Sequence, residues 1–236
     1  RPLAVVVAES ERDVALTLRL ASRMEVRVAP QSGGHGAGPL GDLSGAILLR
    51  TSRLDAVVVD PRARTATVGA GATWGQVAAA AAPHGLAGLA GSSTTVGVVG
   101  YCLGGGIGWL GRLHGLGAGT IESARVALPG GTVVTASSTQ HADLWWALRG
   151  GGGAGIVTEV TLRLFDVPRL TAGTLWWPAE RARDVLRAWA RLLPDLPREI
   201  SSAARVLHLP DIEDLPPHLR GGSFVIVQAA VAGSPG

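Results

Sequence analysis

The sequence predicts an α+β protein in which an α/β ligand-binding region precedes a second, smaller domain. The first 29 residues have the pattern of a strand, a helix and a strand, and a Gly-Gly-His turn follows at residues 33–35. No Asp, Glu, Lys or Arg occurs in the 47 residues from Thr65 to Gly111. After residue 168 glycine becomes rarer and Trp-Trp-Pro appears, which indicates a change of domain.

The first elements place the Gly-Gly-His turn at the edge of a sheet. Residues 3–7 read as a short buried strand. Ser10 is a candidate helix N-cap with Asp13 three positions on, and an amphipathic helix should run to about Met24. Residues 25–29 read as a second strand. Open α/β folds bind ligands at the carboxyl ends of their strands, so the turn after this strand is a candidate binding site.

Later elements follow from alternation, caps and breakers. Thr73 can cap a helix that runs through Ala82, and residues 143–148 form a helical turn. In the second domain, residues 179–193 form a helix with one apolar face, consisting of Val185, Leu186, Trp189, Leu192 and Leu193. The strands expected from alternation and turn signals are residues 46–49, 56–59, 65–68, 122–128, 132–136, 156–165 and 223–232.

Composition excludes several classes of protein. With 47% hydrophobic and 17% charged residues, the chain can form a packed core and is not disordered. All 21 basic residues are Arg, and the net charge is only +3. Arg181, Arg183 and Arg187 alternate with Glu180 and Asp184, which is typical of a solvated helix face. We therefore expect no nucleic-acid partner.

Cysteine usage and hydropathy exclude further classes. A single cysteine excludes an internal disulfide and a thiolate metal cluster, and Cys102 is expected to be a packed thiol. Residues 85–111 are long enough to span a bilayer, but their many glycines and the Ser-Ser-Thr-Thr cluster argue against a membrane helix. We expect no metal site because no His, Asp or Glu cluster has ligand spacing. His114 and His141 have no feature that sets them apart from surface or packing histidines.

Two glycine-rich segments, residues 31–36 and 94–108, indicate a large, flat and partly anionic cofactor. Main-chain N–H groups in such turns can cradle phosphates without a cationic side chain, and bare backbone can pack flat against an aromatic ring. The alternative is a pair of tightly turning loops. His35 has a neutral ring nitrogen near pH 7 and could act as a nucleophile or could simply bond to the backbone of its turn.

Three motifs in order resemble the FAD-linked oxidases of the vanillyl-alcohol-oxidase/PCMH superfamily, most closely the berberine-bridge-enzyme-like branch. They are the Gly-Gly-His turn, the Thr-Val-Gly-rich run at residues 94–108, and residues 143–153 with the Gly-Ile-Val-Thr that follows at 155–158. The resemblance implies a PCMH-type FAD-binding domain of two α/β subdomains over residues 1–168. It implies that residues 169–236 begin an antiparallel-sheet substrate domain with helices.

The resemblance also implies a function. The family removes a hydride from a CH–OH or activated C–H substrate, such as a sugar or secondary metabolite, with O₂ as the expected acceptor. It implies FAD joined covalently to His35. Tyr101 could polarise a substrate hydroxyl near the flavin, or it could be a packed aromatic. The family's usual base lies in the substrate domain or beyond it.

The motif matches assign specific positions to the cofactor site. They lie in the Gly-Gly-His turn, the Thr-Val-Gly-rich run and the strand that follows the third motif. The expected cofactor-binding residues are Ser32, Gly33, Gly34, His35, Gly36, Thr95, Val96, Gly97, Gly100, Tyr101, Gly104, Gly105, Gly108, Ile156 and Val157.

The chain departs from the family pattern at three points. Many members bind the flavin a second time through a cysteine, at the position where this chain has Ser93. Cys102 lies nine residues later, so a single bond through His35 is expected. The loop at Ala154-Gly155 is one residue short. Tyr101 stands where the family usually has His.

Two other interpretations of the sequence are possible. In an NAD-dependent Rossmann enzyme the fingerprint G-x-G-x-x-G would be expected, but Trp109 stands at the position of the last glycine. A non-catalytic or degenerate flavin-binding protein is the second alternative, because both ends of the chain look truncated against the family pattern and one loop is short. No signal peptide is visible, so a cytoplasmic location is expected, with secretion left open by the apparent truncation. The oligomeric state is not indicated by the sequence.

Overall fold

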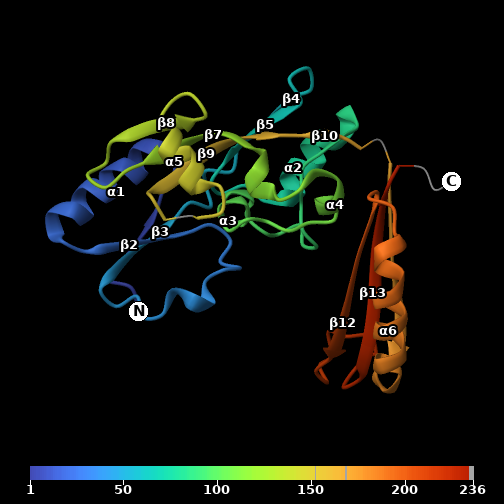
Figure 1. Ribbon diagram of the computed structural model, residues 1–236. Helices are drawn as coiled ribbons and strands as arrows, with labels where there is room; N and C mark the ends of the chain where they lie inside the picture. Colours follow the sequence, from blue (N-terminus) through green and yellow to red (C-terminus); the bar gives the residue numbers. More distant parts are fainter. Residues whose placement is uncertain (152, 168, 234–236) are drawn as a thin grey trace. The chain divides into compact units, whose positions relative to one another are not determined.

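The computed structural model describes residues 1–151, 153–167 and 169–233. Gly152 of the third motif and Pro168 at the expected domain boundary lie outside the described residues. The chain divides into two compact units (Figure 1). The first comprises Arg1–Gly111 and Gly115–Asp166, and the second comprises Arg112–His114 with the chain from Val167 onward.

The first unit begins with a parallel three-stranded sheet formed by β1 (Ala4–Val7), β2 (Arg27–Gln31) and β3 (Ala46–Arg50). Its strand order is β1-β3-β2, so β3 lies between the first two strands of the chain. β3 takes the central place because its apolar residues are buried on both sides, as is typical of a central parallel strand. The Gly-Gly-His turn follows the carboxyl end of β2 directly, as predicted.

Helix α1 (Glu11–Met24) begins at the predicted cap. The Ser10 side chain accepts a hydrogen bond from the Asp13 backbone N–H, and the Asp13 carboxylate accepts one from the Ser10 N–H. This reciprocal pair is a capping box. The helix ends at Glu25, which adopts a left-handed conformation with φ of 55°, and β2 therefore starts at Arg27, two residues later than predicted.

The second part of the first unit is an antiparallel five-stranded sheet of order β4-β5-β9-β7-β8. Its strands lie where the sequence predicted them, with ends that differ by one or two residues. β6 (Leu86–Ala87) pairs separately with β10 (Phe165–Asp166). The five strands are β4 (Val57–Asp60), β5 (Thr65–Gly69), β7 (Ile121–Ala127), β8 (Val133–Ser137) and β9 (Ile156–Arg163).

Short helices connect these strands. α2 (Trp74–Ala81) begins at the predicted Thr73 cap, and α5 (Ala142–Leu148) covers the predicted helical turn. α3 (Val98–Leu103) and α4 (Gly111–His114) were not predicted. The 3₁₀ turns of the first unit are η1 (Gly38–Leu40), η2 (Ala82–His84) and η3 (Gly117–Thr120). In the described part of the chain, no helix combines the length and the apolar character needed to cross a membrane.

The second unit is an antiparallel sheet of order β11-β13-β12, with α6 (Ala182–Leu192) packed along it (Figure 1). The strands are β11 (Leu170–Pro178), β12 (Ile200–His208) and β13 (Ser223–Ala232). Turns η4 (Ala179–Arg181) and η5 (Leu193–Asp195) flank the helix. The predicted helix and the strand at 223–232 are confirmed, whereas β11 and β12 were not predicted.

Only part of the predicted apolar face of α6 is covered. Val185 is buried, and the Trp189 indole N–H donates a 3.0 Å hydrogen bond to Ser202 on β12. Leu192 was expected on the same face but is 55% exposed. The helix is therefore held to the sheet through its middle turn.

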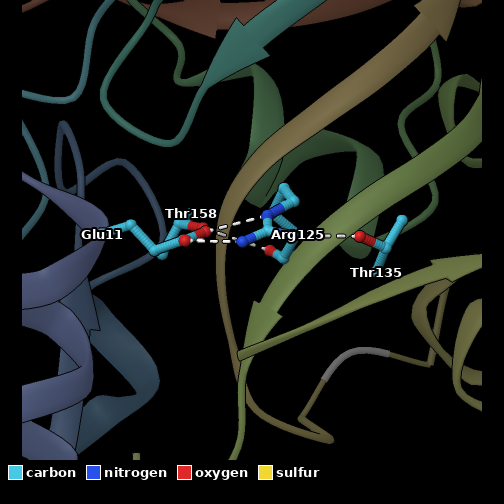
Figure 2. A network of polar contacts seen from close by, with 4 residues as sticks. All are labelled: Glu11, Arg125, Thr135 and Thr158. Atoms are coloured by element: carbon cyan, nitrogen blue, oxygen red, sulfur yellow. Dashed lines mark hydrogen bonds and ion pairs between the residues drawn. The ribbon is translucent and has the colours of Figure 1, made fainter. Parts of the chain in front are cut away.

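A polar network joins α1 to the five-stranded sheet (Figure 2). The Arg125 guanidinium on β7 donates two hydrogen bonds to the Glu11 carboxylate, at 2.6 and 3.0 Å. The Thr158 hydroxyl on β9 donates to the same carboxylate at 3.0 Å, and Arg125 also donates to Thr135 on β8. A bidentate pair of this kind fixes both distance and orientation. The network thus fixes the position of α1 against three strands of the sheet.

The Glu11 network predicts a pH-dependent contribution to stability. Hydrogen bonds from Arg125 hold the pKa of the Glu11 carboxyl below its ordinary value of 4.5, and Thr158 adds to this effect against the opposing effect of burial. Because the folded pKa is lowered, the stabilisation is present above pH 4.5 and is lost as the pH falls through the folded pKa. We expect Glu11→Gln to lower the free energy of unfolding by about 1 kcal/mol at pH 7, since the pair is partly exposed.

Urea unfolding between pH 7 and pH 3 measures this contribution. The difference between wild type and Glu11→Gln should shrink toward the acidic end. Glu122→Gln is the matched control, because Glu122 lies exposed on the same strand as Arg125. Equal pH profiles for Glu11→Gln and wild type would contradict the assignment.

Candidate functional site

Two adjoining cavities in the first unit contain most of the predicted cofactor residues. The larger has a volume of about 700 Å³ and the other about 600 Å³, each within the usual range of small-molecule sites. Four residues line both cavities, namely Pro30, Gln31, Ser32 and Gly100. The predicted residues in the larger cavity are Ser32, Gly33, Gly34, His35, Gly36, Val96, Gly97, Gly100, Tyr101 and Gly104, and those in the smaller one are Ser32, Gly100, Ile156 and Val157.

The smaller cavity lies between the parallel three-stranded sheet and the antiparallel five-stranded sheet. Leu18, Ala21 and Ser22 of α1 line one side of it. Residues 153–157, at the start of β9, line another side. The shortened loop at Ala154-Gly155 is therefore part of the cavity wall.

Helix α3 forms the wall between the cavities. Val98, Val99 and Cys102 are buried in its inner face. Gly100 faces both cavities, and a Cβ built on it meets no atom within 4 Å. The space beside Gly100 is thus kept open by the missing side chain, which allows a ligand to approach the helix backbone.

The two glycine-rich segments contact each other beside the larger cavity. A Cβ on Gly97 would lie 2.9 Å from the Ser32 Oγ, so a side chain at this position would displace the Ser32 side chain. The His35 Nε2 lies 3.0 Å from the Thr95 Oγ1, across 60 positions of sequence. Thr95 is therefore brought to the site as a partner of the histidine, although it is not a lining residue of the larger cavity.

Gly105 and Gly108 lie outside the linings of both cavities. A Cβ on Gly108 would lie 2.1 Å from the Ala90 carbonyl oxygen, so this glycine is needed for backbone packing. The carbonyl of Gly105 accepts a hydrogen bond from the Ala118 N–H. The backbone packing of the loop therefore accounts for Gly105 and Gly108. The residues between them, Gly106 and Ile107, line the larger cavity instead.

The third motif, residues 143–153, supports the loop at residues 104–108 through hydrogen bonds. The Arg149 guanidinium lies 4.3 Å from the Trp145 ring centroid and donates to the carbonyls of Ala118 and Gly119. The backbone N–H groups of Gly117 and Ala118 donate in turn to Gly106 and Gly105. The described part of the motif thus holds the cavity loop in place through η3.

Tyr101 fits the packed alternative better than the catalytic one. Its hydroxyl donates a 2.9 Å hydrogen bond to the Leu89 carbonyl, and its ring lies edge-on to Trp74 with centroids 5.4 Å apart. Burial raises the pKa of the hydroxyl to about 12. The hydroxyl is therefore protonated and engaged, although the ring lines the larger cavity. These contacts favour a packing role for Tyr101 over a catalytic one.

Cys102 and Ser93, the two residues considered for a second flavin bond, have different surroundings. Cys102 is fully buried, and burial raises the pKa of its thiol to about 12, as expected of a packed cysteine. The Ser93 Oγ lies 3.1 Å from the Thr95 Oγ1 and so extends the contact made by His35. Cys102 is unsuited to act as a nucleophile, because the thiolate is the reactive form.

Several lining residues were missed in the sequence. Pro30, Gln31, Ala37 and Ile107 line the larger cavity, and Ile107 is 80% exposed. An isoleucine inside a glycine run is the one signal that could have singled out Ile107. The α1 residues of the smaller cavity share the helical periodicity of core positions, so their sequence pattern did not distinguish them.

The family model described as FAD binding domain matches residues 2–137. With the mixed α/β fold and the ordered motifs, this match places the chain in a known family. The chain belongs to the FAD-linked oxidase family of the vanillyl-alcohol-oxidase/PCMH superfamily, with berberine-bridge-enzyme-like proteins among its structural neighbours.

Individual relatives carry oxidoreductase and oxidase names. The FAD-linked oxidoreductase pynB of Aspergillus niger is 35% identical over 184 residues, which cover 77% of this chain and 34% of that protein. A xylooligosaccharide oxidase of Thermothelomyces thermophilus is 33% identical, covering 81% and 39%. The crystal structure of 6-hydroxy-D-nicotine oxidase from Arthrobacter nicotinovorans matches with a TM-score of 0.85 at 27% identity, covering 98% and 50%. The chain therefore spans about a third to a half of these relatives.

The residues present fit FAD. The larger cavity is lined without a single Lys, Arg, Asp or Glu, and the stretch of bare backbone at Gly100 leaves room for a ligand. Peptide N–H groups in glycine-rich turns can hold phosphate groups. Within the described residues, no group of three or more His, Cys, Asp or Glu could hold a metal ion.

The surroundings of Tyr101 predict that its hydroxyl ionises only at high pH. Because Tyr101 is the one tyrosine of the chain, its ionisation can be followed by tyrosinate absorbance near 295 nm. We expect the absorbance to rise only near pH 12, compared with the ordinary value of 10.0. Tyr101→Phe is the control and should show no rise. A transition at pH 10 or below in the folded protein would contradict the packed assignment.

Proposed function

We propose that this protein is part of, or acts as, an FAD-dependent oxidoreductase. It removes a hydride from a CH–OH or activated C–H group of a small substrate, such as a sugar or a secondary metabolite, and passes the electrons to O₂. The observation that carries the proposal is the placement of His35 in a cavity walled by two bare glycine-rich segments. The oxidase and oxidoreductase names of the relatives support the reaction class.

The residues of the two cavities divide the tasks of holding the cofactor. The glycine-rich turn at residues 32–36 and the exposed backbone at Gly100 would hold FAD, which supplies the redox chemistry when bound. Ile156 and Val157 would add apolar contacts from β9. The protein's own part is to bind and orient the flavin and to limit the access of water.

His35 would join the flavin covalently. A ring nitrogen would form a bond to the 8-methyl carbon, and one C–H bond of that methyl would break. The proton would leave to solvent and the electron pair would remain on the flavin, which O₂ then reoxidises. The exposed position of His35 in the cavity lining supports access to the methyl group. A second bond is not proposed, because Ser93 stands at the usual cysteine position and Cys102 is fully buried.

We assign residues 1–168 to the FAD-binding domain and residues 169–236 to part of a substrate-binding domain. The compact unit that ends at Asp166 contains both cavities, which supports the first assignment. The antiparallel sheet β11-β13-β12 with α6 supports the second. A non-catalytic flavin-binding protein is the alternative, favoured by the short loop at Ala154-Gly155 in the cavity wall.

The covalent bond predicts acid-stable flavin. After acid precipitation, the yellow colour should stay with the pelleted protein, and His35→Ala should move it to the supernatant. His84→Ala is a matched control, because His84 is exposed in η2 and lies outside both cavity linings. Flavin in the wild-type supernatant would exclude the bond while leaving flavin binding intact. A colourless protein would contradict the flavin proposal itself.

Because the space at Gly100 is open, adding one methyl group there should have opposite effects on protein stability and on FAD affinity. Gly100→Ala should keep or raise stability, by up to about 1 kcal/mol, because alanine favours a helix over glycine. The same methyl points into space that FAD would occupy, so we expect FAD affinity to fall by about tenfold or more.

Gly45→Ala is the control for this experiment. A Cβ there also meets no atom within 4 Å, and Gly45 lies outside both cavity linings. Thermal unfolding and FAD titration, carried out in the His35→Ala background, separate the two effects. Unchanged affinity in Gly100→Ala would place the cofactor elsewhere.

A further inference from the structure

Three side chains form a continuous hydrogen-bonded row beside the larger cavity. The His35 Nε2 lies 3.0 Å from the Thr95 Oγ1, and the Thr95 Oγ1 lies 3.1 Å from the Ser93 Oγ. The imidazole comes from the turn after β2, whereas both hydroxyls come from the segment before α3. The row therefore fixes one ring nitrogen of His35 from a different part of the chain.

The segment that carries Thr95 is firmly held. The Trp74 N–H donates to the Val96 carbonyl at 3.0 Å, and the Gly75 N–H donates to the Thr94 carbonyl at 2.8 Å. The Val98 N–H donates to the Ala72 carbonyl at 3.0 Å. The backbone on both sides of Thr95 is thus fixed against the start of α2, and its hydroxyl is placed in advance for His35.

The direction of the hydrogen bonds decides which ring nitrogen can react. A neutral imidazole carries one N–H, and its other nitrogen holds the reactive lone pair. If the Nε2–H donates to the Thr95 Oγ1, and the Thr95 hydroxyl donates to the Ser93 Oγ, the Nδ1 keeps its lone pair and the half-buried Ser93 hydroxyl can turn its own hydrogen to solvent. In the opposite direction the Nδ1 would carry the hydrogen and could not act as a nucleophile.

We propose that Thr95 is a positioning residue for flavin attachment, which holds His35 as the Nε2–H tautomer so that the Nδ1 forms the bond. This inference rests on the covalent attachment proposed above. The same hydroxyl then accepts from the Nε2–H of the alkylated imidazolium, and hydrogen bonds to a charged group are stronger than neutral ones. Ser93 completes the row as the acceptor for the Thr95 hydroxyl.

The test follows attachment over time. Protein produced without flavin is mixed with FAD, and acid-stable flavin in the pellet is measured. We expect Thr95→Val to slow attachment by about tenfold or more, and Thr95→Ser to restore most of the rate because it retains the hydroxyl. Ser93→Ala should slow attachment by about threefold or less, because it removes only the outer hydrogen bond.

Two measurements separate positioning from packing. In the His35→Ala background no bond can form, so a change in the FAD dissociation constant on Thr95→Val reports direct binding alone, and we expect it to be smaller than the change in attachment rate. Nitrogen-15 NMR of labelled histidine in the flavin-free protein, above pH 8, should show His35 with hydrogen on the Nε2. NMR of the isolated flavin peptide should show the bond at the Nδ1.

The outcomes distinguish this inference from the proposed function. If the wild type attaches flavin but Thr95→Val does so at the same rate, or the bond is found at the Nε2, the role of Thr95 is overturned and covalent attachment survives. Equal slowing by Thr95→Ser and Thr95→Val also overturns it. If the wild type binds FAD without any acid-stable flavin, the covalent bond fails and this inference fails with it.

Discussion

The close approach of two glycine-rich segments is the constraint on which the site depends. The two segments approach so closely that a Cβ on Gly97 would lie 2.9 Å from the Ser32 Oγ and would displace that side chain. This contact lets the turn after β2 meet the segment before α3, where Thr95 reaches the His35 ring. The same absence of side chains leaves open space beside Gly100. One compositional feature thus accounts for both the position of the histidine and the shape of the cavity.

The smaller cavity also depends on a fixed position of α1 against the five-stranded sheet. The smaller cavity is lined on one side by α1 and on another by the start of β9. The bidentate pair of Glu11 and Arg125, with Thr158, fixes α1 against the five-stranded sheet (Figure 2). Buried Val14 and Ile156 pack in the same apolar cluster. Polar and apolar contacts therefore set the width of the cavity together.

Local features of the fold could be predicted from the sequence, and non-local ones could not. The Ser10 capping box and the strand at 223–232 depend on neighbouring residues, and both were predicted correctly. The insertion of β3 between β1 and β2 depends on pairing across the chain, which periodicity does not encode. Helix α3 forms in spite of Gly100, because Val98, Val99 and Cys102 are buried in the core.

In the candidate site, too, local features could be predicted from the sequence and tertiary contacts could not. The glycine motifs located most of the lining of the larger cavity, because runs of glycine can be recognised in the sequence. The hydrogen bond of Tyr101 to the Leu89 carbonyl and the backbone contact at Gly108 are tertiary features, so the sequence could not separate their packing roles from cofactor roles. The contact between His35 and Thr95 spans 60 positions and required the fold to be known.

Peptide mapping can locate the flavin on the chain. Trypsin cuts this lysine-free chain after arginine, and the peptide from Val28 to Arg50 contains His35 as its one histidine. His84, His114 and His141 fall on other tryptic peptides. We expect the flavin mass on the 28–50 peptide, and we expect fragmentation to place it on His35. Flavin on another peptide, or FAD bound with every peptide unmodified, would contradict the account.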